Sequence, residues 1–394
     1  MNTSVSNKLF ARILPGENSS LSDQIPHCPN PGCKNFRNPP SDSKWYMHYG
    51  WYQTKIRGRV RRLRCKTCDS TFSPMAFHID HFAKRTVDYV AVLTHLVSSS
   101  GNANTCRILG IRDSTLSNRV RRLSRVCQAI HSQVRSELGC GQSESAFVLD
   151  GFESFCQSQY HPNNINIVVG SGHEFIYQAG LSVLKRKGRM TVKQKATRDR
   201  LEKEHPTNSK ETEHSVANLL QDIGVHANGR TGIPLFTDEH KTYPRSLATA
   251  DPQGDTFVHY QISSKEPRGR YNPLFPVNYA DRQFRKDLAN HVRETVQFAR
   301  SPVAMMSRLA LYLFYHNYLS PYRVRRFRKG DWSTRAEMMS IGEARLKEIV
   351  AQHWGRRTFQ KKTELWSAEK KTWEMGWRNP GEKFGQYVPK YIAA

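Results

Sequence analysis

The stretch that most constrains the fold of this chain is AFVLDGFES, residues 146–154. It predicts a short apolar strand that delivers Asp150 to its end, followed by Gly151, where the backbone can turn sharply. Two further strands are predicted at residues 164–170 and 173–181, and the Gly-Ser-Gly sequence between them is typical of a hairpin turn. The three strands are therefore expected to form an antiparallel meander.

A second aspartate follows another apolar strand later in the chain. Residues 233–237 predict a strand that ends in Asp238, and residues 256–262 predict one more strand before a helix that carries Asp281. Aspartates often do no more than cap strand ends, but two such strands and an acidic helix favour metal chemistry. The order resembles a ribonuclease-H-like core for metal-dependent phosphoryl transfer.

The charge balance indicates a polyanionic partner. The 394 residues include 60 Lys and Arg against 34 Asp and Glu, a net charge of +26 that is spread along the chain. Double-stranded DNA is the expected partner. An anionic membrane is the alternative, but no apolar run approaches the roughly 18 residues of a spanning helix, so no membrane partner is expected. The first residues lack the apolar core of a signal peptide, which favours a reducing, cytoplasmic location.

Two close cysteine pairs predict a structural zinc site in a zinc ribbon at residues 25–80. The four expected ligands are Cys28, Cys33, Cys65 and Cys68. Strands are predicted at residues 44–52 and 55–64, joined near Gly50. The alternative is four buried, reduced cysteines without a metal. Residues 1–24, which precede the ribbon, are expected to form a flexible arm.

Residues 84–136 predict a helix-turn-helix DNA-binding domain. Helices are expected at residues 84–99, 102–109 and 114–134, with Gly110 ending the second and Asp113 capping the third. The third helix carries four arginines expected to contact DNA in the major groove: Arg119, Arg121, Arg122 and Arg125. A plain helical hairpin with a solvated basic face is the alternative.

The third acid of the metal site has more than one candidate. At about 100° per residue, Asn278 and Asp281 lie roughly 60° apart, on one helix face with Arg285. In a continuous helix Glu294 would point about 140° away from Asp281, so Asp281 is preferred. A capping box with Asn278 as N-cap is the competing interpretation. The third ligand is therefore Asp281 or Glu294, or it is lost with Asn278.

These features together resemble the bacterial insertion-sequence transposases of the DDE type. The resemblance covers most of residues 25–325, and residues 278–318, NYADRQFRKDLANHVRET…FARSP…HNY, look like the end of that catalytic domain. It implies a ribonuclease-H-like domain with a mixed sheet at residues 143–325. It also implies Mg²⁺ or Mn²⁺ held by Asp150, Asp238 and Asp281, with Arg285 neutralising a phosphate. Asn278 stands where many relatives keep glutamate.

Two segments flank or interrupt the expected catalytic domain. Residues 184–214 form a basic insert, either solvated surface or an arm along a phosphate backbone. Residues 326–394 are expected to form a helical tail with one amphipathic helix at residues 341–354. Its tryptophans either stack on unpaired bases or, as we expect, pack the tail onto its own domain; they are Trp354, Trp366, Trp373 and Trp377.

The sequence thus predicts an α/β multidomain protein that cleaves and joins the DNA ends of an insertion element. We expect it to act on DNA as a homo-oligomer associated with the nucleoid. The leading alternative is a domesticated, catalytically inactive DNA-binding protein, and a weaker one is a structure-specific nuclease on the same fold. The recognised DNA end and the target preference are not encoded in any of these motifs.

Overall fold

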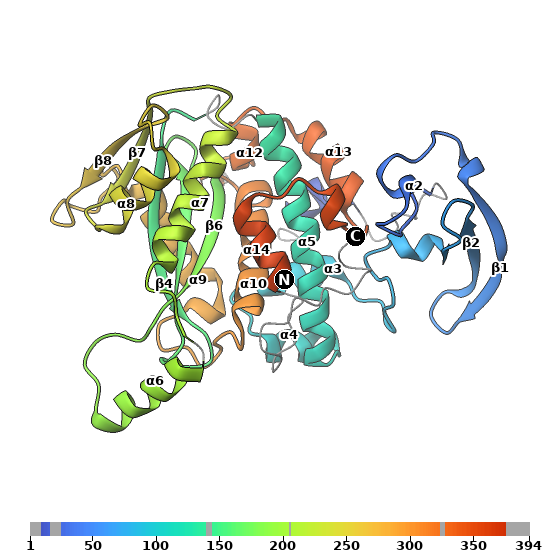
Figure 1. Ribbon diagram of the computed structural model, residues 1–394, viewed down its shortest axis with the longest axis horizontal. Helices are drawn as coiled ribbons and strands as arrows, with labels where there is room; N and C mark the ends of the chain where they lie inside the picture. The colour runs from blue at the N-terminus through green and yellow to red at the C-terminus, as the bar shows by residue number, and fades with distance from the viewer. Residues whose placement is uncertain (1–8, 16–24, 139–143, 205, 324–327, 376–394) are drawn as a thin grey trace.

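The computed structural model describes residues 9–15, 25–138, 144–204, 206–323 and 328–375. A small ribbon domain lies at one end of the molecule, helices occupy the middle, and a β-sheet lies at the other end (Figure 1). In these ranges no helix is both long and apolar enough to cross a membrane.

The ribbon is a three-stranded antiparallel sheet in the order β1-β2-β3. Its elements are α2 (Lys34–Arg37), β1 (Tyr46–Thr54), β2 (Gly58–Cys65) and β3 (Thr71–Phe72). The predicted turn near Gly50 is wrong, because β1 continues to Thr54 and pairs with Gly58 there. Gly50 instead has a φ of +105° where the register shifts between His48 and Trp51, so it accommodates a bulge.

The predicted order of three helices is present after the ribbon. The helices are α3 (Tyr89–Leu96), α4 (Asn102–Leu109) and α5 (Asp113–Leu138). Gly110, with a φ of +62°, ends α4 in the left-handed conformation that glycine adopts easily. The prediction that Asp113 caps the third helix is wrong, because Asp113 is itself the first residue of α5.

Five described strands form one mixed sheet in the order β6-β5-β4-β7-β8. They are β4 (Phe147–Phe155), β5 (Pro162–Gly170), β6 (Ile176–Val183), β7 (Ile233–Asp238) and β8 (Phe257–Ile262). The predicted meander is confirmed, since β4, β5 and β6 pair antiparallel. Strand β7 pairs parallel with both β4 and β8.

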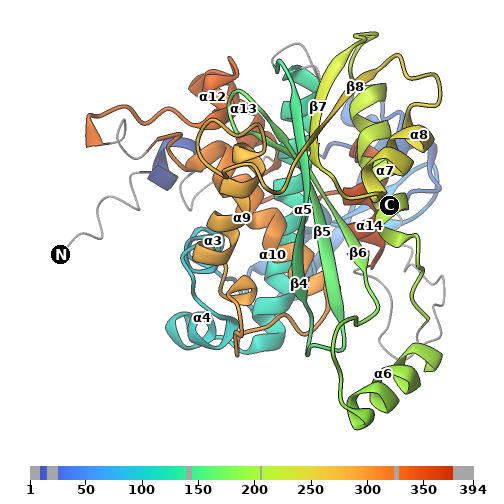
Figure 2. The same cartoon turned by 90° about the vertical axis from the view of Figure 1, so that its left-hand side faces the viewer.

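Helices cover both faces of this sheet. Helices α7 (Glu211–Val225) and α8 (Thr242–Ala250) lie on one side, while α9 (Phe275–Asp287) and α10 (Pro302–Phe314) lie on the other (Figure 2). Helix α6 (Val192–Glu204), in the basic insert, buries none of its residues and projects away from the sheet (Figures 1 and 2). The insert is thus partly helical, with its charges in solvent.

Strand β4 differs from its predicted form at the position that matters most. The strand does not end at Asp150 but continues to Phe155, paired with β5 throughout. Gly151 is therefore not a turn. A Cβ at this position would lie 2.4 Å from the side-chain amide nitrogen of Asn164, so glycine leaves room for the Asn164 side chain to lie across β4.

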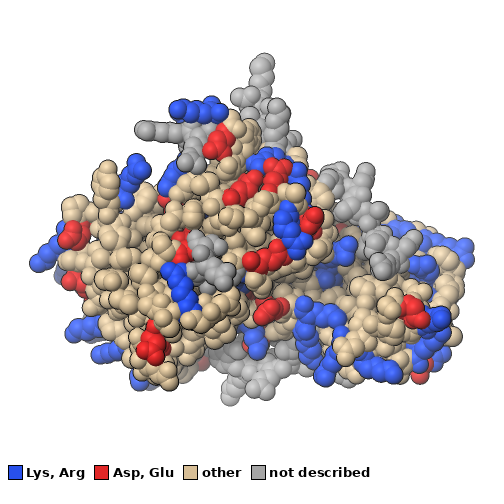
Figure 3. Space-filling model, turned by 90° about the horizontal axis from the view of Figure 1, so that it is seen from above, with Lys and Arg blue, Asp and Glu red and all other residues tan. Residues whose placement is uncertain are grey.

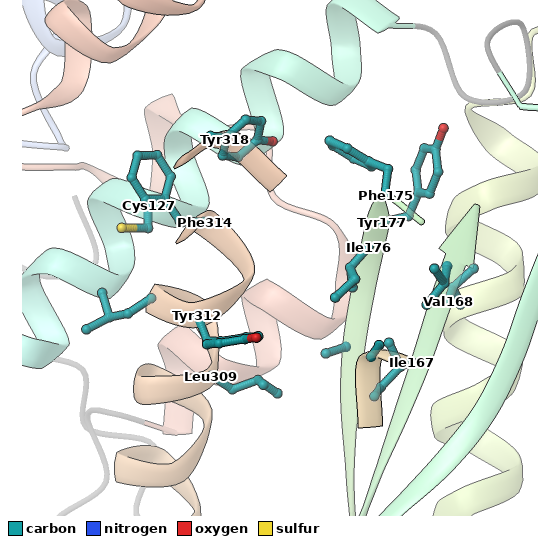
Figure 4. Packing of buried hydrophobic residues seen from close by; sticks show 14 of the residues in the cluster. Cys127, Ile167, Val168, Phe175, Ile176, Tyr177, Leu309, Tyr312, Phe314 and Tyr318 are labelled. Atoms are coloured by element: carbon teal, nitrogen blue, oxygen red, sulfur yellow. The ribbon is translucent and has the colours of Figure 1, made fainter. Parts of the chain in front are cut away.

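One hydrophobic core runs through the helices and the sheet. Helix α5 packs along α10, and one cluster of buried residues includes Cys127 of α5, Leu309 of α10, and Ile167 and Ile176 of the sheet, all labelled in Figure 4. The expected boundary between residues 84–136 and 143–325 therefore does not divide the core. The ribbon has a separate hydrophobic cluster, which includes Phe36, Trp45 and Leu63.

The two ends of the described chain pack onto this core. Phe10 stacks on Tyr315, and Arg12 bonds to Glu337 and Glu343, so residues 9–15 are not a flexible arm. The tail contributes α12 (Arg335–Met338), α13 (Glu343–His353) and α14 (Ser367–Met375). Three of its tryptophans are buried as predicted, namely Trp354, Trp366 and Trp373. Trp377 lies outside the described residues.

Candidate functional site

The four predicted zinc ligands come together in the ribbon. Their sulfur atoms all lie within 4.8 Å of one another, and Cys28, Cys33, Cys65 and Cys68 are the only described residues to form such a group of three or more. The Sγ atoms of Cys28 and Cys68 are 3.7 Å apart, and those of Cys33 and Cys65 are 3.8 Å apart. A tetrahedral zinc ion with Zn–S bonds of about 2.3 Å holds its sulfurs about 3.8 Å apart. The cluster is therefore compatible with a structural zinc site.

The surroundings of these thiols also suit a metal. Burial raises the pKa of Cys28, which disfavours a bare thiolate there. Around Cys68 burial is outweighed by hydrogen bonds from Ser70 and Asn30, which lower its pKa to about 6. The side-chain amide of Asn35 donates to Cys65 Sγ over 3.6 Å and so orients that sulfur.

A second candidate site lies on the large sheet, where β4 and β7 run parallel. Phe147 pairs with Leu235, and Val148 pairs with Phe236. Continued by two residues, this register places Asp150 beside Asp238, the last residue of β7. The two predicted carboxylates are thus neighbours on adjoining strands.

Asp150 is partly buried and firmly held. Its Oδ1 accepts the backbone N–H of Gly151 at 2.7 Å and the hydroxyl of Tyr243 at 3.1 Å. Burial raises the pKa of Asp150, and the negative charge of Asp238 raises it further. These two carboxylates therefore repel each other across the strand pair.

Helix α9 brings Asp281 to the same place. The helix packs on β4 and β5, with Phe284 against Phe152 in an edge-to-face contact. Burial and the charge of Asp150 raise the pKa of Asp281 to about 8, and Arg285 and Arg268 oppose this shift. Its buried Oδ1 has no hydrogen-bond partner among the described residues. A buried carboxylate oxygen without a donor fits coordination to a cation.

The competing interpretations of the third acid can now be compared. Helix α9 begins at Phe275 with Leu274 as its N-cap, so the capping box with Asn278 and Asp281 is wrong. The amide of Asn278 donates to the carbonyl of Leu274. The helix is also not continuous from Asp281 to Glu294, so the angle of about 140° between them does not apply. Helix α9 ends at Asp287, and Glu294 follows in a non-helical segment with a φ of +56°.

Two residues that sequence reasoning missed stand beside the acids. Tyr243, near the start of α8, is buried, and its pKa is raised by burial and by the charges of Asp150, Asp238 and Asp281. Arg268, in the exposed segment before α9, lowers the pKa of both Asp150 and Asp281. Tyr243 follows Asp238 closely in sequence, which was the one available signal. Nothing local distinguishes Arg268 from other arginines.

The predicted phosphate contact, Arg285, lies near the acids. Its guanidinium stacks over Phe152 at 4.5 Å and donates to the carbonyl of His291. Burial lowers its pKa, and the nearby charge of Arg293 acts in the same direction, whereas Asp281 opposes the shift. The side chain therefore supplies positive charge beside Asp281.

The carboxylates are less closely gathered than the cysteines. Their charges interact, but among the described residues the four cysteines, and not Asp150, Asp238 and Asp281, form a group whose possible ligand atoms are gathered closely enough to hold a metal ion. Hard divalent cations such as Mg²⁺ and Mn²⁺ prefer carboxylate oxygens. The three aspartates offer such oxygens, but these are not gathered around one point as the four sulfurs are.

The four arginines predicted to read DNA have different surroundings. Arg119 is 3% exposed and lies 3.6 Å from Asp80, with a further bond to the carbonyl of Arg85. We therefore do not retain Arg119 as a DNA contact. Arg122 donates to the carbonyls of Ile79 and His81. Most of α5 is buried, so the helix cannot enter a major groove along its length.

Positive charge is nevertheless concentrated on the surface. Lys and Arg side chains gather at the ribbon end of the molecule (Figure 3). On the β1–β2 hairpin, the guanidinium of Arg59 stacks over Trp51 at 4.7 Å and that of Arg64 over Tyr49 at 5.4 Å. Both rings are about half exposed. Such arginine–aromatic surfaces suit nucleic acids.

The chain thus carries a cluster of four cysteines, a set of three aspartates from β4, β7 and α9, and a basic surface. Sequence reasoning had named the main residues of the first two. Comparison with models of known protein families and with curated proteins finds no match for this chain.

Proposed function

We propose that the protein is a DNA transposase of the DDE type, with Asp150, Asp238 and Asp281 as its metal-binding carboxylates. One observation carries the proposal: helix α9 sets a buried carboxylate oxygen of Asp281, which has no hydrogen-bond partner among the described residues, near Asp150, and Asp150 neighbours Asp238 on the adjoining parallel strand. The sheet order also supports it, because a meander continued by two parallel strands is expected of a ribonuclease-H-like core.

The residues have distinct tasks in this proposal. Asp150, Asp238 and Asp281 would hold the divalent ions through their carboxylate oxygens. When bound, the two divalent ions would stabilise the attacking and leaving oxygens of phosphoryl transfer. Tyr243 fixes the orientation of Asp150 through its hydroxyl. Arg285 and Arg268 provide positive charge for a phosphate next to the carboxylates.

The remaining features fit a protein that acts on DNA. Such a protein would be associated with the nucleoid. The net charge of +26 suits a phosphate backbone, and the ribbon presents arginines stacked on exposed rings. A zinc ion in the Cys₄ cluster would stabilise the ribbon that holds this surface.

The direct test uses DNA that carries the short inverted repeats flanking the gene. Purified protein should nick a repeat end in the presence of Mg²⁺, and Asp150→Asn should abolish nicking without loss of DNA binding. Asp255→Asn removes an exposed carboxylate from the turn before β8 and should leave nicking unchanged. Failure of the wild type to nick any repeat end, with binding intact, would favour the inactive regulator.

A second step separates transposase from nuclease. A transposase should join the cleaved end to a second duplex, which appears as a product longer than either substrate. Cleavage without joining, under conditions where both duplexes are bound, would indicate a nuclease on the same fold.

A further inference from the structure

A pocket of about 170 Å³ lies where the start of the helical region, helix α5 and the tail meet. Its walls come from Ile79, His81 and Phe82, from α5, from residues 356–358 and from Trp373 of α14. Five of its lining residues are arginines and none is an aspartate or glutamate: Arg121, Arg122, Arg125, Arg356 and Arg357. Such a pocket selects for an anion.

The arginines are held in place by the fold. Arg122 donates to the carbonyls of Ile79 and His81, at 2.6 and 2.7 Å. The backbone N–H of Arg357 donates to the carbonyl of Phe77 at 2.8 Å, and its guanidinium donates to that of Ala76. Because these bonds fix the side chains of Arg122 and Arg357 before any ligand arrives, those two need little ordering on binding.

The charges in the pocket oppose one another. Burial, together with the charges of Arg121, Arg122 and Arg357, lowers the pKa of Arg125 to about 9. Its guanidinium lies 5.6 Å from the centre of the Trp373 ring. An anion placed among these groups would replace repulsion by attraction.

Aromatic residues complete the site. Trp373 lines the pocket, and Phe82 also lines it while 79% exposed. Phe82 has a φ of +56°, a conformation that bulky residues rarely adopt. Its ring centre lies 4.0 Å from that of His81. An exposed ring beside guanidinium groups is suited to the sugar and base next to a bound phosphate.

We propose that this arginine pocket binds one backbone phosphate of DNA, with Phe82 contacting the adjoining nucleotide. Guanidinium groups match the oxygen atoms of phosphate and bind them through paired N–H groups. The choice of DNA over a free phosphate rests on the proposed function, whereas the preference for a phosphate group rests on the pocket itself. The pocket would hold DNA jointly by α5 and by the tail.

The test measures how binding of a duplex of about 20 base pairs depends on salt, without Mg²⁺, so that catalysis plays no part. Each phosphate contact contributes about 0.9 to the slope of log K against log salt. Replacing two exposed pocket residues, in Arg121→Gln/Arg356→Gln, should lower the slope by about 0.9 and weaken binding about tenfold near 0.1 M salt. Adding Arg125→Gln should lower the slope no further, because all three contact one phosphate.

The control removes the same number of charges from an acid-paired site. In Arg345→Gln/Lys347→Gln the lost charges lie on α13 and are paired with Glu137, Glu348 and Glu343. Its slope should equal that of the wild type. An equal fall in the control, or no fall in the double variant, would overturn the proposal. So would a fall of about 0.9 for every arginine removed, since that pattern indicates separate phosphates.

Inorganic phosphate separates the two sources of the anion. It should compete for the pocket only weakly, raising the melting temperature of the wild type slightly and that of the double variant not at all. A strong phosphate effect combined with unchanged DNA binding by the double variant would assign the pocket to a free anion. Absence of nicking activity would leave all of these binding results interpretable.

Discussion

At the scale of single residues, the carboxyl group of Asp281 is the most informative feature of the molecule. Burial and the charge of Asp150 raise its pKa to about 8, and its buried Oδ1 has no hydrogen-bond partner among the described residues. An anion in this environment is unfavourable unless a cation joins it. A substitution at Asp281 can therefore separate the proposed metal-binding role of this carboxylate from a purely structural one.

Asp281→Asn should abolish Mg²⁺-dependent cleavage while leaving DNA binding intact. Removal of a metal-binding carboxylate should lower the cleavage rate by at least about 100-fold. Single-turnover cleavage of a repeat end measures this loss. Glu294→Gln is the control and should cleave normally, because Glu294 is not among the charges that shift the pKa of Asp150 or Asp281. The opposite result, normal cleavage by Asp281→Asn and none by Glu294→Gln, would assign the third ligand to Glu294.

The raised pKa of Asp281 also predicts how stability depends on pH. In the unfolded chain an aspartate has a pKa of about 3.9, so between about pH 4 and pH 8 the folded protein binds one more proton. This stabilisation is complete below about pH 4 and is lost as the pH rises through about 8. Without added divalent ions, urea unfolding should show stability falling by at most about 1.4 kcal/mol per pH unit from this group. Asp281→Asn should have a flatter profile, and identical profiles would contradict the assignment.

At the scale of secondary structure, β4 fixes the position of Asp150 because the strand continues beyond this residue. The strand pairs with β5 from Phe147 to Phe155, which fixes Asp150 in the middle of a ladder and not at a frayed end. Its other edge pairs with β7, so Asp238 falls beside Asp150. Gly151 leaves room beside Asp150 for the side chain of Asn164 on β5. Rigid pairing on both sides pre-organises the two carboxylates.

Gly151→Ala should destabilise the protein by about 1 kcal/mol, because the added methyl group would displace the side-chain amide of Asn164 and break its hydrogen bond to Asn166. Urea unfolding of the variant measures the change in the free energy of unfolding. Gly269→Ala is the matched control, since nothing lies within 4 Å of its Cβ position, and it should change stability by less than about 0.5 kcal/mol. Equal effects of the two substitutions would show that the contact with Asn164 does not matter.

At the scale of the whole molecule, the chain folds into two cores and not into a series of independent domains. The larger core includes residues from Phe10 to Trp366, and the ribbon has its own. The tail connects them: Phe359 packs into the ribbon core, and Gly355 accepts a hydrogen bond from Ile79. A buried ion pair of Arg135 and Glu369, 2.7 Å apart, fastens α14 to α5.

Cys65→Ser should release the ribbon without unfolding the rest of the protein. Wild-type protein should contain one zinc ion per chain and the variant none, because a structural site requires its full set of thiolates. Proteolysis should then cut within the ribbon while the sheet stays intact, since the two cores are separate. Cys106→Ser, outside the cluster, should retain zinc. Zinc bound to the Cys65 variant, or collapse of both cores, would contradict this.

The sequence by itself determined the features that depend on local pattern. The sequence correctly predicted that the four cysteines come together, that three strands form a meander and that Asp238 ends a strand. It also predicted the order of α3, α4 and α5. Alternation of apolar residues, cysteine spacing and glycine at turns act over a few residues, so they can be recognised without knowing the rest of the chain.

Only the tertiary structure decided what those elements contact. The sequence placed Arg119 and Arg122 together on the third helix, but Asp80 binds Arg119 inside the protein, while the carbonyls of Ile79 and His81 hold Arg122 at the wall of the arginine pocket. Arg268 and Phe359 gained their roles from neighbours far away in sequence. Burial and charge at a site are sums over the surrounding side chains, and those neighbours are set by the packing of distant segments rather than by local sequence.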